Sequence, residues 1–209
     1  MSRIAATVAT AVVAVGLGAA GWYAFGSGQG SDRYAACRAS SMAGGAAEIG
    51  GPFSMIDDTG ARVSEADVIT GPTLFYFGYT FCPDVCPLDV SRNAEAIDLL
   101  AEQGKTVTPV FVSIDPGRDT PQMLSEFTDF MHPRMVGLTG TQDEVDRIVD
   151  AYRVYAERAR GTGDDDYYLM NHSTLSYLMA PGEGMLEFYR QDVSAEQMAE
   201  SIGCFVEHS

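Results

Sequence analysis

The pattern of apolar and polar positions divides the chain into an apolar N-terminal stretch and a longer part in which strands and helices alternate. Residues 4–25 contain no charged side chain, whereas residues 26–50 are rich in small residues. Two continuous apolar runs, 73–79 and 108–114, are typical of strands that are buried on both faces of a sheet. These runs predict the centre of the sheet.

Four helices are predicted from apolar residues at helical spacing, from Pro121 at a first-turn position and from two capping boxes. They cover 85–103, the region around 123–131, 141 to about 156, and 194 to about 206. Shorter strands are predicted at 135–138, 175–180 and 185–190, and a hairpin at 53–56 and 61–64. Strand–helix alternation followed by a hairpin and a last helix predicts an α/β sandwich with a mixed central sheet flanked by helices.

The apolar segment 4–25 is long enough to cross a membrane, because as a helix it would span roughly 33 Å. Arg3 and the α-amino group precede it, which places the N-terminus in the cytoplasm, and Trp22 and Tyr23 lie near its far end, where such rings favour the membrane interface. We therefore expect residues 1–25 to form a transmembrane helix. A cleaved signal peptide is the alternative, since small residues near its end suit a cleavage site.

Either alternative exports the rest of the chain. Residues 26–50 are then a linker and approach segment, and residues 51–209 form one folded domain. We expect the protein to be a single-pass protein of the inner membrane, with this domain on the periplasmic side.

The 209 residues include 13 Lys and Arg against 29 Asp and Glu, which gives a formal net charge of −16. Such a surface repels phosphates, so we expect no nucleic-acid partner. Cationic partners and metal ions are compatible with this charge.

Chemistry is expected at Cys82 and Cys86, which follow a predicted buried strand at the mouth of a predicted helix. A helix N-terminus stabilises a thiolate, and the i, i+4 spacing brings both sulfurs to one helical face. The pair can form a disulfide or share a soft metal ion such as Cu(I). Of the three histidines, His172 precedes the predicted strand 175–180, so a loop can bring it over the same sheet end. Spacing alone does not specify this third ligand.

Three motifs resemble the Sco/SenC family in its order, from about residue 50 to the C-terminus. They are FGYTFCPDVCP at 77–87, SIDPGRDTP at 113–121, and NHS at 171–173, with Tyr177 beyond them. Members of that family are membrane-anchored, thioredoxin-like copper chaperones for cytochrome c oxidase assembly. The resemblance therefore implies a thioredoxin-like fold.

The resemblance also implies copper, as Cu(I) or Cu(II), held by Cys82, Cys86 and His172. The implied partners are the copper-binding subunit of cytochrome c oxidase and a thiol reductant protein. A metallochaperone is favoured over an enzyme. The alternatives are a thiol–disulfide oxidoreductase that uses Cys82 and Cys86 as a redox pair, and a copper- or redox-sensing signalling protein.

Two residues depart from the family pattern, in which His often stands at Phe81 and Asp usually stands at Asn171. The missing carboxylate at Asn171 bears on affinity or redox behaviour rather than on ligand identity. Residues 115–121 are interpreted as a strand end and helix cap, with a partner-docking loop as the alternative.

The other two cysteines, Cys37 and Cys204, are expected to form a structural disulfide between the segment after the anchor and the last helix. Apart from His208, neither has a further potential ligand within a few residues. Free thiols are the alternative.

Overall fold

The computed structural model describes residues 33–38, 49–160 and 167–209, and the chain divides into two compact units, Met1–Ala36 and Cys37–Ser209. The strands and helices of the described ranges lie in the second unit. No helix within the described ranges is long and apolar enough to cross a membrane. The anchor predicted at 1–25 lies outside those ranges.

The described residues of this unit contain nine strands, and seven of them form one mixed sheet. The strands are β1 (Ser54–Asp57), β2 (Arg62–Ser64), β3 (Thr73–Gly78), β4 (Thr108–Ser113), β5 (Val136–Thr139), β6 (Ala156–Arg158), β7 (Met170–His172), β8 (Ser176–Ala180) and β9 (Gly184–Tyr189). The order in the large sheet is β2-β1-β5-β4-β3-β8-β9. Strands β3, β4 and β5 run parallel, whereas β1, β8 and β9 pair antiparallel with their neighbours. Strands β6 and β7 form a separate antiparallel pair.

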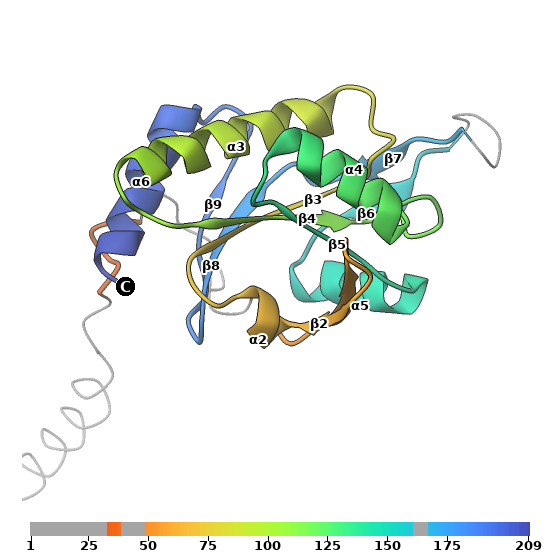
Figure 1. Ribbon diagram of the computed structural model, residues 1–209, viewed down its shortest axis with the longest axis horizontal. Coiled ribbons are helices and arrows are strands. Elements are labelled where there is room, and N and C mark those ends of the chain that lie inside the picture. The colour runs from red at the N-terminus through yellow and green to blue at the C-terminus, as the bar shows by residue number, and fades with distance from the viewer. Residues whose placement is uncertain (1–32, 39–48, 161–166) are drawn as a thin grey trace, which may run out of the picture. The chain divides into compact units, whose positions relative to one another are not determined.

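The helices that flank the sheet in the described part of the chain are α2 (Glu65–Val68), α3 (Val85–Glu102), α4 (Pro121–Met131), α5 (Gln142–Ala151) and α6 (Ala195–Glu207). Figure 1 shows α3 and α4 on one side of the sheet and α2 and α5 on the other. Helix α6 packs along α3. The expected mixed sheet with helices on both faces is confirmed.

Helix starts follow the local signals in the sequence. The Thr120 hydroxyl accepts a hydrogen bond from the backbone N–H of Met123, with Pro121 in the first turn of α4. Capping boxes begin α5 at Thr141 and α6 at Ser194, as predicted.

The core lies around β3 and β4, where apolar side chains are buried on both faces of the sheet. All six residues of β3 are buried, as the continuous apolar run predicts. On one face, Phe75 and Phe77 contact the ring of Tyr152, with centroids 5.4 and 5.2 Å apart. These packed rings hold the carboxyl end of β3 in position.

The chain after α5 differs from the sequence prediction. The helix was expected to continue to about residue 156, but it ends at Ala151. The cause is Arg153, which adopts a positive φ of 54° and reverses the chain. Strand β6 then pairs with β7, and neither this pair nor the short helix α2 was predicted.

Candidate metal centre

The two predicted cysteines lie at the junction between β3 and α3. Cys82 is in the loop that follows β3, and Cys86 is in the first turn of α3. The backbone N–H of Cys86 donates to Cys82 Sγ, with N and Sγ 3.3 Å apart. Both side chains are free thiols and both are buried. The strand–helix junction therefore presents two sulfurs to one site.

His172 reaches these sulfurs from a different part of the chain. Its Nε2 lies 3.3 Å from Cys86 Sγ, although the residues are 86 positions apart. The sequence analysis predicted that His172 lies in a loop. This prediction is wrong, because His172 ends β7 and pairs with Ala156 of β6. Strand β8 starts beside the carboxyl end of β3, which brings the preceding β7 to that end of the sheet.

The imidazole of His172 is oriented by its second nitrogen. Nδ1 lies 2.8 Å from the backbone oxygen of Ser173. A carbonyl oxygen only accepts, so Nδ1 carries the proton in this hydrogen bond. In the neutral ring, Nε2 then has a free lone pair directed at the sulfurs, which is the tautomer that binds a metal.

Two tyrosines enclose the imidazole. The rings of Tyr76 and Tyr79 meet the ring of His172 edge to face, at interplanar angles of 88° and with centroids 6.2 and 6.0 Å away. The Tyr76 hydroxyl donates to Asp89, and the Tyr79 hydroxyl accepts from the N–H of Met170. Burial raises the pKa of both phenols, so they stay protonated.

The two thiols have opposite pKa shifts. A hydrogen bond from the Cys86 thiol lowers the pKa of Cys82 well below its usual range, and the N–H of Cys86 acts in the same direction. That hydrogen bond and burial raise the pKa of Cys86. Cys82 is therefore the thiolate of the pair, as expected at a helix N-terminus.

The three donor atoms of Cys82, Cys86 and His172 lie within 4.8 Å of one another. Two sulfurs and an imidazole nitrogen are soft to intermediate donors, which suit Cu(I) and zinc better than magnesium or calcium. Because the three atoms already converge, a metal ion requires only small side-chain movements. The residues present thus fit a soft metal ion.

The loop that carries Cys82 is held by Asp119, a residue that sequence reasoning treated as a possible helix cap. Its carboxylate accepts from the N–H and hydroxyl of Thr80 and from the hydroxyl of Ser113. Asp119 is fully buried, and burial raises its pKa. Thr120 is the cap, so Asp119 is free to fix the start of the cysteine loop.

Asp115 and Arg118 form a second support beside this loop. Asp115 accepts from Arg118 Nε and from the Tyr168 hydroxyl, and only 4% of Asp115 is exposed. The Arg118 guanidinium lies over the rings of Tyr168 and Phe81. These contacts favour the structural interpretation of residues 115–121 over a docking loop.

Gly78 determines how closely Cys86 approaches the strand. A Cβ at this position would lie 3.0 Å from both Cys86 Sγ and Phe111 Cε2. Phe111 is fully buried, so we expect Gly78→Ala to displace the sulfur and to lower the free energy of unfolding by about 1–3 kcal/mol. Urea unfolding and Cu(I) titration measure the two effects. Gly71→Ala is the matched control, because its Cβ would meet no atom within 4 Å. Equal stability and equal Cu(I) affinity in the two variants would contradict the expectation.

Asn171 lies on the opposite face of β7 from His172. Residues 170 and 172 are half-buried, whereas Asn171 is exposed, as alternation along a strand requires. We therefore expect Asn171→Asp to change Cu(I) affinity by less than about threefold, since a solvated charge is screened. Competition titration of both forms measures this, and a tenfold change would show that residue 171 reaches the metal.

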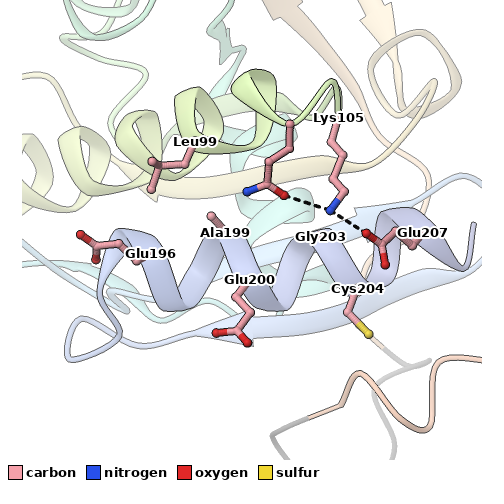
Figure 2. A pocket seen from close by; sticks show the side chains of 9 residues that line it. Leu99, Lys105, Glu196, Ala199, Glu200, Gly203, Cys204 and Glu207 are labelled. Atoms are coloured by element: carbon pink, nitrogen blue, oxygen red, sulfur yellow. Dashed lines mark hydrogen bonds and ion pairs between the residues drawn. The ribbon is translucent and has the colours of Figure 1, made fainter.

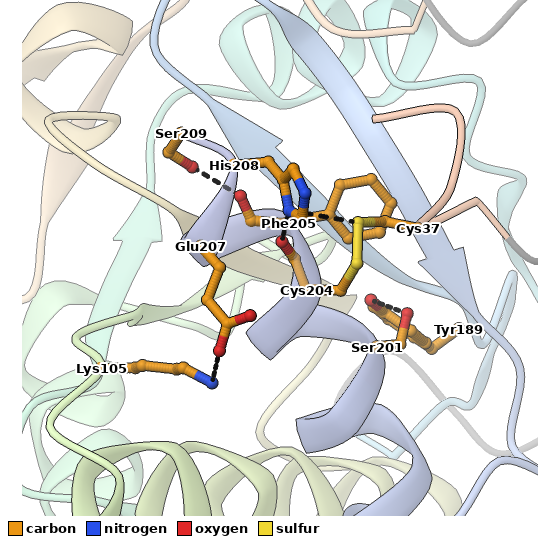
Figure 3. Close-up of a disulfide and its surroundings, with 9 residues drawn as sticks. All are labelled: Cys37, Lys105, Tyr189, Ser201, Cys204, Phe205, Glu207, His208 and Ser209. Atoms are coloured by element: carbon orange, nitrogen blue, oxygen red, sulfur yellow. Dashed lines mark hydrogen bonds and ion pairs between the residues drawn. A yellow bond between two sulfur atoms is a disulfide. The ribbon is translucent and has the colours of Figure 1, made fainter. Parts of the chain in front are cut away.

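The remaining cysteines form the expected disulfide. Cys37 and Cys204 are bonded across 167 positions of the sequence, with their Cα atoms 5.7 Å apart (Figure 3). The bond ties the start of the folded unit to α6. This prediction is confirmed.

The fold and the site together define a class, the thioredoxin-like α/β proteins with a dithiol–imidazole site at a strand–helix junction. Solved structures of this fold include Arabidopsis thaliana ScoI with copper bound, with a TM-score of 0.72 and 38% identity over 76% of this chain and 99% of that chain. Yeast Sco1 with copper bound has a TM-score of 0.71 and 32% identity, over 77% of this chain and 89% of that chain.

The sequence comparison identifies the family. Residues 41–207 match the SCO1/SenC family. Protein SenC of Rhodobacter capsulatus is 51% identical over 206 residues, which are 99% of this chain and 91% of that protein. The mitochondrial SCO1 homolog of Homo sapiens is 37% identical, over 74% of this chain and 52% of that protein. The chain belongs to the SCO1/SenC family.

Proposed function

We propose that this protein is a copper chaperone that binds copper through Cys82, Cys86 and His172 and delivers it to cytochrome c oxidase during assembly. The observation that carries the proposal is the convergence of two sulfurs and an oriented imidazole nitrogen within 4.8 Å. Copper is present in solved relatives of the same fold at 38% and 32% identity. In this proposal copper is cargo, not a resident cofactor.

The position of the third ligand supports release of the ion. His172 belongs to the β6–β7 pair, which is not hydrogen-bonded into the seven-stranded sheet. Withdrawal of the imidazole therefore leaves the large sheet intact. The dithiol that remains holds copper through fewer ligands, and a receiving site with more ligands can take the ion from it.

The proposal includes location and partners. Residues 1–25 are proposed as a single-pass anchor in the inner membrane, with the folded unit on the periplasmic side. The support is the uncharged segment 4–25 behind Arg3. The proposed partners are the copper-binding subunit of the oxidase and a thiol reductant protein, because a Cys82–Cys86 disulfide would leave no thiolate for copper.

Copper transfer tests this function directly. The full chain, reduced, loaded with Cu(I) and held in detergent, is incubated without oxygen with the copper-free binding subunit of cytochrome c oxidase. We expect copper to move to the subunit, as measured after separation of the two proteins. The Cys82→Ser/Cys86→Ser variant, with its Cys37–Cys204 disulfide intact, should transfer none. Retention of all copper by the wild-type chain would contradict the proposal.

A thiol–disulfide oxidoreductase is the second candidate function. It is favoured by the lowered pKa of Cys82 and by the proximity of a second free thiol, since a thiolate beside a thiol can exchange with a disulfide. This activity needs no imidazole ligand. His172→Ala should therefore retain reduction of an oxidised oxidase subunit, whereas it should impair copper transfer.

A further inference from the structure

A second cluster of two sulfurs and one imidazole lies at the carboxyl end of α3, on α6 and the segment that precedes the fold. It consists of Cys37, Cys204 and His208, whose donor atoms also lie within 4.8 Å of one another (Figure 3). His208 Nδ1 is 3.8 Å from Cys37 Sγ. Within the described residues, these three and the Cys82–Cys86–His172 set are the groups of such donors that converge in this way.

The two clusters have the same types of donor residue and a similar arrangement along the chain. In the first, Cys86 lies in the first turn of a helix, Cys82 lies four residues earlier in the preceding loop, and a distant histidine completes the set. In the second, Cys204 and His208 are spaced i, i+4 at the end of a helix, and the distant Cys37 completes the set. Residues at this spacing lie on one helical face. The clusters differ in oxidation state, because Cys37 and Cys204 are bonded.

We propose that reduction of the Cys37–Cys204 disulfide opens a second Cu(I) site, formed by Cys37, Cys204 and His208. The ligand class is a soft monovalent copper ion, because two thiolates and one imidazole suit it. This site is separate from the proposed chaperone site. The two clusters lie at opposite ends of helix α3, whose 18 residues have a length of roughly 27 Å.

Reduction of the Cys37–Cys204 disulfide is a two-electron reaction. A dithiol reductant attacks one sulfur of the disulfide, its second thiol releases the mixed disulfide, and the reductant leaves as a disulfide. The S–S bond breaks, and Cys37 and Cys204 each gain one electron and one proton. Cu(I) binding then releases both thiol protons and forms two Cu–S bonds, while copper stays monovalent.

Helix α6 has contacts that keep Cys204 and His208 in place after the disulfide is reduced. Ile202 and Phe205 are fully buried. Lys105 Nζ lies 2.8 Å from Glu207 Oε1 and donates to Gln103, which joins the last turn of α6 to the end of α3 (Figure 2). Figure 2 also shows the Cys204 side chain directed away from Lys105.

Gly203 permits this contact, because a Cβ there would lie 2.9 Å from Lys105 Nζ. The helix end is therefore held by more than the S–S bond. Cys204 itself is half-buried and lines a pocket of about 480 Å³ between the two helices. Solvent therefore reaches the side of α6 that carries this residue.

The imidazole of His208 is less well oriented for metal binding than that of His172. Its Nδ1 donates to the backbone oxygen of Cys204 at 2.8 Å, so binding through this nitrogen breaks a hydrogen bond. His208 is also exposed beside the C-terminus. We therefore expect the second site to bind Cu(I) about tenfold or more weakly than the first.

The test uses the full chain with Cys82→Ser and Cys86→Ser, which removes the first site. The disulfide form and the form reduced with dithiothreitol, which is then removed, are titrated with Cu(I) against a competing chelator without oxygen. We expect one Cu(I) per chain after reduction and none before. X-ray absorption should give two sulfur ligands and one nitrogen ligand.

Further variants in the same background assign the ligands. Cys204→Ser should abolish binding and His208→Ala should weaken it about tenfold or more, whereas the matched control Glu200→Gln should leave it unchanged. Absence of copper in the reduced form would overturn the proposal, as would equal affinity in the His208→Ala variant. Loss of the near-UV circular dichroism signal on reduction would also overturn it, because the site requires folded α6. A failure here leaves the first site untouched, since that site is absent from the tested protein.

Discussion

Replacing His172 with alanine is expected to weaken Cu(I) binding at least about 100-fold while the protein stays folded. The side chain provides one of three converging donors, with Nε2 3.3 Å from Cys86 Sγ. Loss of residues that only orient a metal ligand typically costs about 10–100-fold in affinity, so loss of the ligand itself should cost at least as much as the upper value. The measurement is a competition titration with Cu(I) and a chelator, using the full chain with free Cys82 and Cys86 and an intact Cys37–Cys204 disulfide.

The fold should survive because His172 ends a three-residue strand outside the large sheet. Asn171→Ala is the matched control, since it truncates the neighbouring side chain on the exposed face of the same strand. We expect the control to bind like the wild type. If His172→Ala also does so, copper is held by the dithiol alone, and the oxidoreductase becomes the better proposal.

Removing the second pair of cysteines, by Cys37→Ala and Cys204→Ala, is expected to lower the free energy of unfolding by about 3–5 kcal/mol. The bond joins residues 167 positions apart, so it closes a loop that includes nearly the whole folded unit. In the chain-entropy description, a loop of about 100 residues contributes about 4.7 kcal/mol, and the contribution rises slowly with length. Urea denaturation followed by circular dichroism measures the change.

Reduction provides the matching control for this prediction. Dithiothreitol should lower the stability of the wild-type protein to that of the double variant, and it should not affect the variant. Copper binding at the first site should be unchanged, because that site lies at the other end of α3. A change in unfolding free energy below about 1 kcal/mol would show that the bond does not constrain the unfolded chain.

Sequence patterns predicted the strands and helix starts correctly where local signals are strong. The continuous apolar runs fixed β3 and β4, and the capping boxes at Thr141 and Ser194 fixed the starts of α5 and α6. Cys82 and Cys86 converge as predicted but not on one helical face, because Cys82 lies before α3 and its Sγ accepts from the backbone N–H of Cys86.

The third member of the site does not follow from such rules. His172 reaches Cys86 only because β6 and β7 pair, and each of these strands has three residues. Their formation depends on the end of α5 at Ala151, where Arg153 turns the chain. An arginine at positive φ gives no sequence signal, because this conformation normally requires glycine or asparagine. Its position before the predicted strand 175–180 made His172 a candidate, and the family resemblance indicated it as the third ligand.

The residues that support the cysteine site could not be predicted from the sequence either. Gly78 matters because its missing Cβ leaves space for Cys86 Sγ, which is a property of the packed structure. Asp119 holds Thr80 across 39 positions, so its role depends on the parallel pairing of β3 and β4. Both effects arise from tertiary contacts that periodicity does not describe.

The disulfide also determines how the folded unit bears mechanical load. Because Cys37 is covalently joined to α6, a pull on the chain before Cys37 passes into the C-terminal helix through a covalent bond. The antiparallel pairing of β1, which follows Cys37 along the chain, is bypassed by that force. The load enters at Cys204 in α6, and the length of α3, roughly 27 Å, separates that end of the unit from Cys82 and Cys86.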